Sequence, residues 1–267
     1  MNNMQKTPII VPTMAEMLAK GETPDVLFWV GCAGSFDDRA KKITKAFVKI
    51  LNNINIKFAV LGAEESCSGD PAKRAGNEFL FQMQAMANIE VLQAYDVRRI
   101  VTTCPHCFNT IRNEYPELGG NFNVVHHTQM LQSLIDEGRL TIEGGHYKGK
   151  KITFHDPCYL GRANNVYEAP RILIENLDAE LVEMKRCKSR GFCCGAGGAQ
   201  MFKEPEEGTK DINIERTEEA VETQAEIIAT GCPFCNTMMT DGVKNKEKEG
   251  QIEVLDLAEM IATAKDL

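Results

Sequence analysis

The sequence lacks a long uninterrupted apolar run, and it lacks an excess of basic residues. A membrane-spanning helix needs about 20 consecutive apolar residues, and no segment approaches that length. Residues 1–18 show neither the basic start nor the apolar core of a signal peptide. The 267 residues carry 30 Lys and Arg against 38 Asp and Glu, a net charge of -8, which disfavours a phosphate backbone as a partner. We therefore expect a cytoplasmic chain that binds no nucleic acid and has no membrane span of its own.

Cysteine is too scarce for a disulfide scaffold, at 10 of 267 residues, and the cytosol keeps thiols reduced. Reduced cysteines at organised spacing indicate metal binding. Cys187 stands apart from the others and is interpreted as a small buried hydrophobic residue. The other nine fall into two series, one of Cys32, Cys67, Cys104 and Cys107, the other of Cys158, Cys193, Cys194, Cys232 and Cys235.

The two series have similar intervals. In the first they are 35 (67 − 32), 37 (104 − 67) and 3 (107 − 104) positions. In the second, counted through Cys194, they are 36 (194 − 158), 38 (232 − 194) and 3 (235 − 232) positions. The surrounding segments agree too, because Thr-Thr-Cys-Pro-His-Cys at 102–107 corresponds to Thr-Gly-Cys-Pro-Phe-Cys at 230–235. A repeat of this kind indicates an internal duplication.

The adjacent thiols Cys193 and Cys194 interrupt the match. Counting through Cys194 places Ser66-Cys67-Ser68 opposite Cys193-Cys194-Gly195, so that Ser66 stands where the second half has Cys193. The first half then offers four thiols and the second half five.

Short apolar strands alternate with helical segments in both halves, an order typical of parallel sheets covered on both faces. The predicted fold is α/β, with two pseudo-symmetric, duplicated units whose sheets are mainly parallel. We expect an N-terminal extension at 1–24, a first cysteine-rich unit at 25–140, a charged Gly-rich linker and a second unit at 150–267. Strands are expected at 25–30, 57–61, 99–103, 123–127, 151–155, 181–184, 227–230 and 252–255, and helices at about 36–51, 71–94, 129–137, 165–177, 212–225 and the C-terminus.

The cysteines of both series follow the carboxyl ends of predicted strands. In open α/β sheets this edge is where ligands bind. Three loops per half are therefore expected to converge and to bring cysteines that are distant in the chain to one metal centre.

The number of thiols limits the choice of metal. Four cysteines suit a structural zinc ion as well as a 4Fe-4S cluster. Five do not suit zinc, because a tetrahedral ion would leave one thiol of the adjacent pair unused. The second series therefore favours a multi-iron centre, whereas the first leaves zinc and iron open.

The pattern of Cys158, Cys193-Cys194-Gly195 and Cys232-Pro-Phe-Cys235, with an imperfect first copy, resembles the cysteine-rich CCG domain family over nearly the whole chain. That family includes a subunit of the heterodisulfide reductases in which the five-cysteine motif holds a noncubane 4Fe-4S cluster. The resemblance implies the same cluster on Cys158, Cys193, Cys194, Cys232 and Cys235. For Cys32, Cys67, Cys104 and Cys107 three options remain, in order of preference: a cubane 4Fe-4S cluster, a zinc ion, or an altered cluster with Ser66, Glu65 or Asp70 as an oxygen ligand.

Segments 66–79, 124–128 and 155–162 are similar to the C-terminal portion of membrane-bound iron-sulfur oxidoreductases thought to pass electrons from electron-transfer flavoprotein to menaquinone. Those proteins also carry a haem-binding membrane segment and two ferredoxin-type clusters, for which this sequence has no counterpart. The likeness implies a separate membrane-bound iron-sulfur partner chain, and electron-transfer flavoprotein as a further partner. It also implies a location on the inner face of the cytoplasmic membrane through that partner.

Several charged side chains are candidates for roles beside the clusters. His155 is interpreted either as a hydrogen-bond donor or proton relay at the second cluster, or as a histidine that bonds backbone. Strand alternation places His126 and His127 on opposite faces, so at most one of them is expected to be functional. Arg162 and Arg190 are candidates to offset cluster charge.

Three functions remain open, and no catalytic residue is assigned. We favour an electron-transfer subunit of a respiratory oxidoreductase, which links a flavoprotein or ferredoxin-type partner to a quinone-linked membrane partner. The second is a disulfide reductase that works at the noncubane cluster. The third is a zinc-stabilised structural subunit, which the five-thiol series disfavours.

Overall fold

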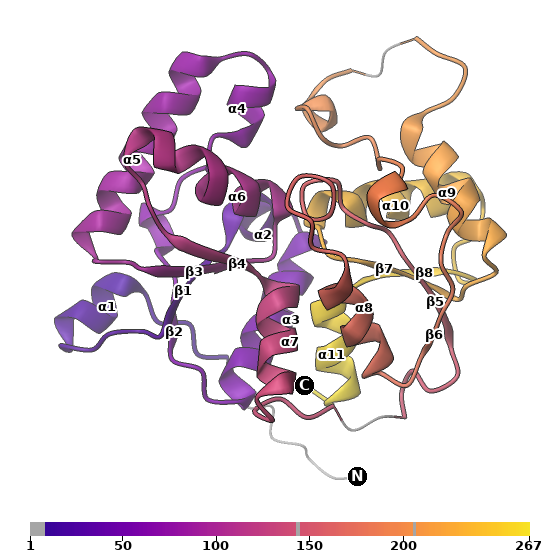
Figure 1. Ribbon diagram of the computed structural model, residues 1–267, viewed down its shortest axis with the longest axis horizontal. Helices are drawn as coiled ribbons and strands as arrows, with labels where there is room; N and C mark the ends of the chain where they lie inside the picture. The colour runs from indigo at the N-terminus through magenta and orange to yellow at the C-terminus, as the bar shows by residue number, and fades with distance from the viewer. Residues whose placement is uncertain (1–8, 143–144, 205–206) are drawn as a thin grey trace.

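The computed structural model describes residues 9–142, 145–204 and 207–267. They form two parallel four-stranded sheets with the orders β2-β1-β3-β4 and β6-β5-β7-β8. Each half of the chain supplies one sheet, and the halves lie side by side (Figure 1). The repeated order confirms the predicted duplicated α/β fold. The strands are β1 Val26–Trp29, β2 Phe58–Ala59, β3 Arg99–Thr102, β4 Asn123–His126, β5 Lys151–Phe154, β6 Glu180–Leu181, β7 Ile227–Thr230 and β8 Glu253–Asp256.

The central strands of each sheet are short apolar runs. Every residue of β1 and β7 is buried, as expected for parallel strands covered on both faces. Phe28 pairs with Val101 in the first sheet, and Phe154 pairs with Ala229 in the second. This shared register lets positions in the two halves be matched residue by residue.

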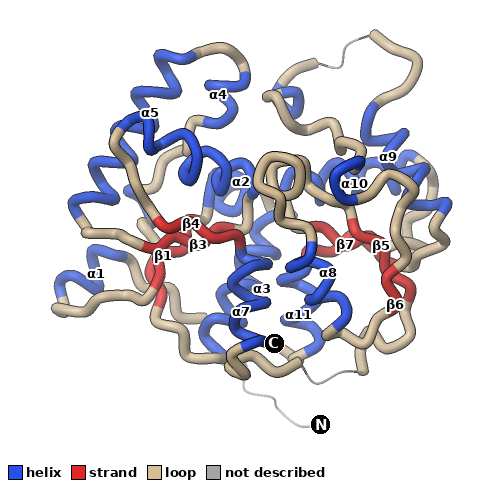
Figure 2. The backbone as a smooth tube through the Cα atoms, in the orientation of Figure 1, coloured by secondary structure: helices blue, strands red, loops and turns tan. Residues whose placement is uncertain are grey.

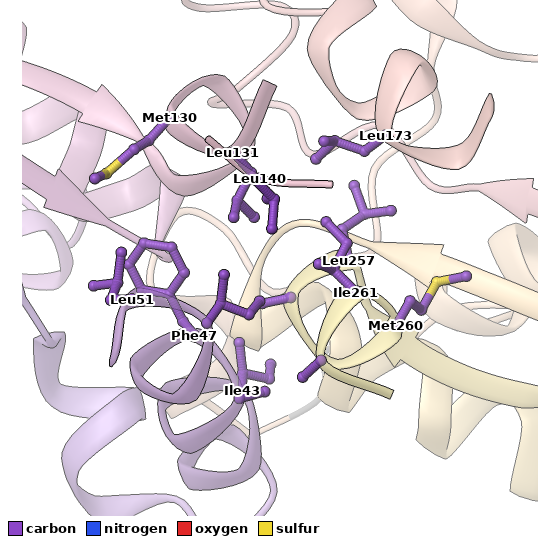
Figure 3. Close-up of a cluster of buried hydrophobic side chains, with 14 of the residues drawn as sticks. Ile43, Phe47, Leu51, Met130, Leu131, Leu140, Leu173, Leu257, Met260 and Ile261 are labelled. Atoms are coloured by element: carbon purple, nitrogen blue, oxygen red, sulfur yellow. The ribbon is translucent and has the colours of Figure 1, made fainter. Parts of the chain in front are cut away.

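Four helices lie between the two sheets and join the halves. Helix α3 packs against α11, and α7 packs against α8. Figure 3 shows the side chains of this contact, including Phe47 of α3, Leu131 of α7 and Ile261 of α11, all in one buried cluster. The two sheets therefore share a core. The helices are α1 Met14–Ala19, α2 Gly31–Phe36, α3 Ala40–Asn53, α4 Asp70–Arg74, α5 Glu78–Ala94, α6 Pro105–Asn109, α7 His127–Asp136, α8 Glu168–Glu175, α9 Ile212–Glu222, α10 Pro233–Asn245 and α11 Leu257–Ala264.

The loops that follow the central strands lie above the sheets in the view of Figure 2, together with α2, α6 and α10. Helices α6 and α10 begin in these loops with Pro105 and Pro233. Proline suits this first position because its fixed φ matches the helix and its missing N–H would have had no partner there. The cysteine loops of both halves are thus presented on one side of the molecule.

Two predicted helices differ from the observed ones. The helix expected at 71–94 is α4 and α5, because Gly76 adopts a left-handed φ of 83° and Asn77 caps α5 by accepting the Leu80 amide. The helix expected from residue 36 begins at Ala40, after Phe36 has ended α2.

The segments outside the two sheets also pack onto them. Within the segment predicted as an N-terminal extension, Thr13 bridges to Val60 beside β2, and Met14 is buried. Within the predicted linker, Leu140 and Tyr147 are buried in the shared core. Across the described residues, no helix combines the length and apolar character required to cross a bilayer.

Candidate metal centre

All nine candidate cysteines lie beyond the carboxyl ends of strands. Cys32 follows β1, Cys67 follows β2, and Cys104 directly caps α6 after β3. In the second half Cys158 follows β5 and Cys232 caps α10 after β7. Gly31 makes the turn from β1 into α2 with a φ of 76°, and a Cβ there would lie 3.3 Å from the Cys107 sulfur. The first cysteine loop thus approaches the Cys104 to Cys107 turn closely.

Sulfur atoms within each half are in contact. In the first half Cys32 pairs with Cys67, and Cys104 pairs with Cys107. In the second half the contacts run from Cys158 to Cys193, Cys194, Cys235 and Cys232. The Sγ atoms of Cys194 and Cys235 lie 3.3 Å apart. Each half therefore gathers its own thiols into one group, which we call the first site and the second site.

The two sites touch each other through the first cysteine of each Cys-Pro-x-Cys turn. The buried thiols of Cys104 and Cys232 lie close enough for each to affect the pKa of the other. The thiols of the first half and those of the second half therefore meet at the boundary between the halves.

Backbone amides and neighbouring thiols favour the ionised form of selected cysteines. The Gly69 amide donates to Cys67 and the Gly195 amide to Cys193, at 3.5 and 3.3 Å. The thiol of Cys32 lowers the pKa of Cys67 to about 6, and the thiols of Cys158 and Cys194 lower the pKa of Cys193 to about 2. Thiolates are the form that binds metals, so Cys67 and Cys193, each with further thiols beside it, fit as ligands of a metal–sulfur group.

Although burial opposes ionisation of Cys232, its pKa is lowered. The Cys104 and Cys235 thiols and the amides of Cys235 and Phe234 donate to its sulfur. Cys232 therefore combines complete burial with an environment that stabilises a thiolate, which is characteristic of a ligand and not of a packing residue.

The structure corrects the match between the two halves by one residue. Gly69 and Gly195 have the same left-handed conformation, with φ of 91° and 92°, and each donates its amide to the sulfur two residues before it. Cys67 therefore corresponds to Cys193, at an offset of 126 (193 − 67) that also relates Cys32 to Cys158 (158 − 32).

With this match, Ser68 and not Ser66 replaces the second thiol of the pair. The Ser68 hydroxyl donates to the Cys107 sulfur over 3.5 Å, just as the Cys194 thiol donates to Cys235 over 3.3 Å. Ser68 is buried, whereas Ser66 is exposed and bonds Asn88. The prediction that Ser66 occupies the position of the missing cysteine is therefore wrong.

The other two oxygen candidates at the first site are held by partners. The Glu65 carboxylate accepts the amides of Val30 and Gly31 at 3.0 and 2.6 Å, next to Cys32. Burial raises the pKa of Glu65 to about 7 against these two hydrogen bonds. Asp70 is paired with His106 at 2.8 Å and with Arg74 at 3.0 Å. Glu65 thus braces the Cys32 loop, and Asp70 is engaged outside the thiol group.

Sequence reasoning missed the buried group around His106. His106 stands within the first Cys-Pro-x-Cys turn, and its ring contacts Tyr159 and Phe234 from the second half, with centroids 4.7 and 5.3 Å away. Arg74 continues the network from Asp70 to Glu114. The sequence offered one signal, because His106 takes the place of Phe234 in the otherwise matching turns.

The histidines at the end of β4 do not point to opposite faces as expected. The strand ends at His126 and α7 begins at His127, so the alternation stops between them. Both rings are fully buried, and His126 Nε2 lies 3.2 Å from His127 Nδ1. His127 Nε2 in turn lies 3.0 Å from the Asp256 carboxylate of the second half. The histidines link the two halves.

Buried charged groups hold the loops of the second site. Both oxygens of Asp156 bond Arg171, at 2.9 and 3.0 Å, and Asp156 also accepts the Lys188 amide at 2.7 Å. Arg162, predicted to offset cluster charge, donates to the Gly191 carbonyl at 2.6 Å, beside the adjacent thiols.

The other two predictions for this region concern Arg190 and Cys187. Arg190 is exposed. Cys187, expected to be buried, is only half-buried.

His155 lies at the second site. One of its ring nitrogens and the sulfurs of Cys194 and Cys235 lie within 4.8 Å of one another. Its Nδ1 accepts a hydrogen bond from Arg216 at 3.0 Å. Burial, followed by the charge of Arg216, lowers the pKa of His155 to about 3. No sequence motif indicated Arg216, which lies on α9 and is fully buried.

An apolar hollow opens beside the first site. Its volume is about 260 Å³, and both halves contribute to its walls. Cys32 and the exposed Phe36 lie on one side, with Phe202 and Phe234 on the other.

The fold and this site define a class of protein: a duplicated parallel α/β chain with cysteine-rich loops that meet at the carboxyl ends of two sheets. The model of the CCG cysteine-rich domain family matches residues 26–112 and 152–240. The chain belongs to this family, once in each half, as the sequence resemblance predicted.

Three curated relatives extend the comparison. The chain is 46% identical over 253 residues to the probable iron-sulfur-binding oxidoreductase FadF of Bacillus subtilis, covering 94% of this chain and 36% of that protein. It is 42% identical to EtfAB:quinone oxidoreductase of Syntrophomonas wolfei, covering 92% and 35%. It is 34% identical to a subunit of the dihydromethanophenazine:CoB--CoM heterodisulfide reductase of Methanosarcina barkeri, covering 91% and 59%. The chain thus spans about a third of the length of the first two.

Proposed function

We propose that the protein is an iron–sulfur oxidoreductase subunit that transfers electrons through two adjacent clusters. The observation that carries this proposal is the proximity of the buried Cys104 and Cys232 thiols, which brings the two thiol groups together. A structural zinc ion needs four ligands and no second site. Two redox sites in contact instead provide a short path for electrons between the halves.

The donor set favours iron at the second site. Cys158, Cys193, Cys194, Cys232 and Cys235 would hold a 4Fe-4S cluster of the noncubane type, because five sulfurs joined by successive contacts exceed the capacity of one tetrahedral zinc ion. Cys32, Cys67, Cys104 and Cys107 would hold a second 4Fe-4S cluster or a zinc ion, with Ser68 beside it. When bound, the clusters would supply one-electron chemistry, while the protein supplies thiolates, amide donors and a buried surround.

The similar proteins suggest the partners. FadF and EtfAB:quinone oxidoreductase are longer than this chain, and the matching region is about a third of each. We propose that a separate membrane-bound iron–sulfur chain and electron-transfer flavoprotein are the partners here. The protein would then lie at the inner face of the cytoplasmic membrane through the first of them.

The first test is the iron, zinc and acid-labile sulfide content of protein purified without oxygen. About eight irons with equal sulfide support two 4Fe-4S clusters, whereas about four irons with one zinc would leave one redox site braced by a structural ion and would contradict the path through two clusters. Zinc alone, with no iron taken up on reconstitution, contradicts the proposal.

A second candidate function is disulfide reduction, favoured by the apolar hollow that reaches Cys32. The similarity to the heterodisulfide reductase of Methanosarcina barkeri accords with it. Anaerobic assay with reduced viologen and a set of disulfides separates the two functions. The reductase is favoured if the protein turns over a disulfide and loses this activity when Phe202→Asp places a charge in the hollow. The electron-transfer subunit is favoured if a quinone-linked partner reoxidises the protein and no disulfide is turned over.

A further inference from the structure

The side chain of His155 is held at one of its two ring nitrogens. Its Nδ1 accepts the Nε–H of Arg216 at 3.0 Å. Arginine is always protonated in proteins and has no acceptor, so Nδ1 must present a lone pair to it. The proton of the neutral imidazole is then on Nε2.

This tautomer excludes two alternatives for His155, a protonated imidazolium and a metal ligand. A protonated imidazolium would carry an N–H on Nδ1 as well, and this donor would face the N–H donor of Arg216. A ligand would need a lone pair on Nε2, which carries the proton as long as Arg216 occupies Nδ1.

Arg216 is itself fixed in place. It is fully buried, its Nη1 bonds Glu219 at 3.0 Å and the Arg186 carbonyl at 2.8 Å, and Glu219 in turn bonds Arg186 at 2.9 Å. The guanidinium cannot turn away from His155 without breaking these bonds.

The Nε2 atom is buried and has no hydrogen-bond partner among the described residues. A buried donor without a partner costs about 1 to 3 kcal/mol, so it marks a position where a partner is expected. The His155 ring offers a nitrogen within 4.8 Å of the sulfurs of Cys194 and Cys235.

The first half repeats this feature with a different side chain. The residues after the paired Phe28 and Phe154 are Trp29 and His155, so these two positions correspond. Trp29 is fully buried, and its Nε1 also lacks a partner among the described residues. Indole is a donor and never a ligand, and Trp29 packs in the same cluster as Cys104 and Cys107.

We propose that His155 is a permanent N–H donor to the sulfur atoms of the group held at the second site, and that Arg216 is the positioning residue that keeps the proton on Nε2. This inference rests on the proposed iron–sulfur function. Reduction adds negative charge to the sulfurs, and an N–H dipole stabilises that charge. His155 therefore raises the reduction potential of the second site, and Trp29 does the same at the first.

The test is a redox titration of the anaerobically purified full chain, followed by electron paramagnetic resonance. His155→Leu should keep the iron and give about a tenfold lower ratio of reduced to oxidised second cluster at a fixed ambient potential, a shift of about 59 mV for a one-electron couple. His155→Gln, which retains an amide N–H, should recover part of the shift. Trp29→Phe should shift the first cluster alone.

Arg216 is tested with matched variants. Arg216→Gln keeps a donor to His155 Nδ1 and should leave the potential close to that of the natural protein, while Arg216→Leu should lower it as His155→Leu does. In the natural protein, pulsed measurements should detect an exchangeable proton near the second cluster and no directly bound nitrogen.

The outcomes separate the two proposals. Loss of second-site iron in both His155 variants, or a directly bound nitrogen, would make His155 a ligand and overturn the inference. Unchanged potentials in both His155 variants would overturn it as well, with the clusters intact. Absence of iron from the natural protein would instead remove the proposed function on which the inference depends.

Discussion

The ring of His127 and the carboxylate of Asp256 meet at 3.0 Å, fully buried, although 129 positions separate them in the chain. Asp256 ends β8 and caps α11 by accepting the Ala258 amide. His127 begins α7, directly after β4. The contact therefore links the corresponding last strands of the two sheets through the shared core.

Removal of this carboxylate should weaken the association of the halves. We expect Asp256→Ala to lower the free energy of unfolding by about 2 to 4 kcal/mol, because it leaves the buried Nε2 of His127 without a partner and removes a helix cap. Asp256→Asn keeps an acceptor and a good capping residue, so its loss should be about half as large or less. Urea unfolding of both variants measures the difference, and equal losses would show that the carboxylate charge matters more than the hydrogen bond.

The corrected match of the halves predicts which serine controls the first site. Ser68→Cys should add a fifth thiol beside Cys107 and move the spectrum of the first cluster toward that of the second. Ser66→Cys is the matched control and should leave the spectrum unchanged, since Ser66 is exposed and bonds Asn88. If Ser66→Cys had the stronger effect, the one-residue correction would not hold.

The adjacent thiols should act at the second site only. Cys193→Ser and Cys194→Ser are expected to remove or convert the second cluster, because each sulfur contacts other cysteines of that site. The spectrum of the first cluster should persist in both variants. Cys187→Ser serves as the control, since Cys187 lies outside both sites, and its iron content should equal that of the natural protein. If Cys193→Ser and Cys194→Ser both left the iron content and the spectra unaltered, the assignment of five ligands to the second cluster would be contradicted.

The buried pair of Arg171 and Asp156 should support the loop that carries Cys158. Loss of one partner of a buried ion pair costs about 3 to 5 kcal/mol, so Arg171→Ala should destabilise the protein by this order and reduce iron at the second site. The pair of Arg98 and Asp96 is more than three-quarters exposed, and Arg98→Ala should change stability by less than about 0.5 kcal/mol. Thermal unfolding together with iron analysis tests both variants, and a fully stable Arg171→Ala protein would exclude this supporting role.

The fold class and the grouping of cysteines were predictable because both depend on local pattern. Apolar runs such as β1 and β7 indicate buried parallel strands wherever they stand, and the repeated cysteine intervals are visible without coordinates. The break between α4 and α5 was missed, although Gly76 and Asn77 are local signals for it.

The sequence by itself determined that the chain is duplicated, that its sheets are parallel, and that two groups of thiols follow the strand ends. Only the tertiary structure decided that Cys104 touches Cys232, that Ser68 stands in the place of Cys194, and that Arg216 holds His155. The physical reason is that these relationships depend on the conformation of a left-handed glycine and on packing between segments far apart in the chain. Interval counting cannot resolve a shift of one residue, whereas an amide that donates to a particular sulfur can.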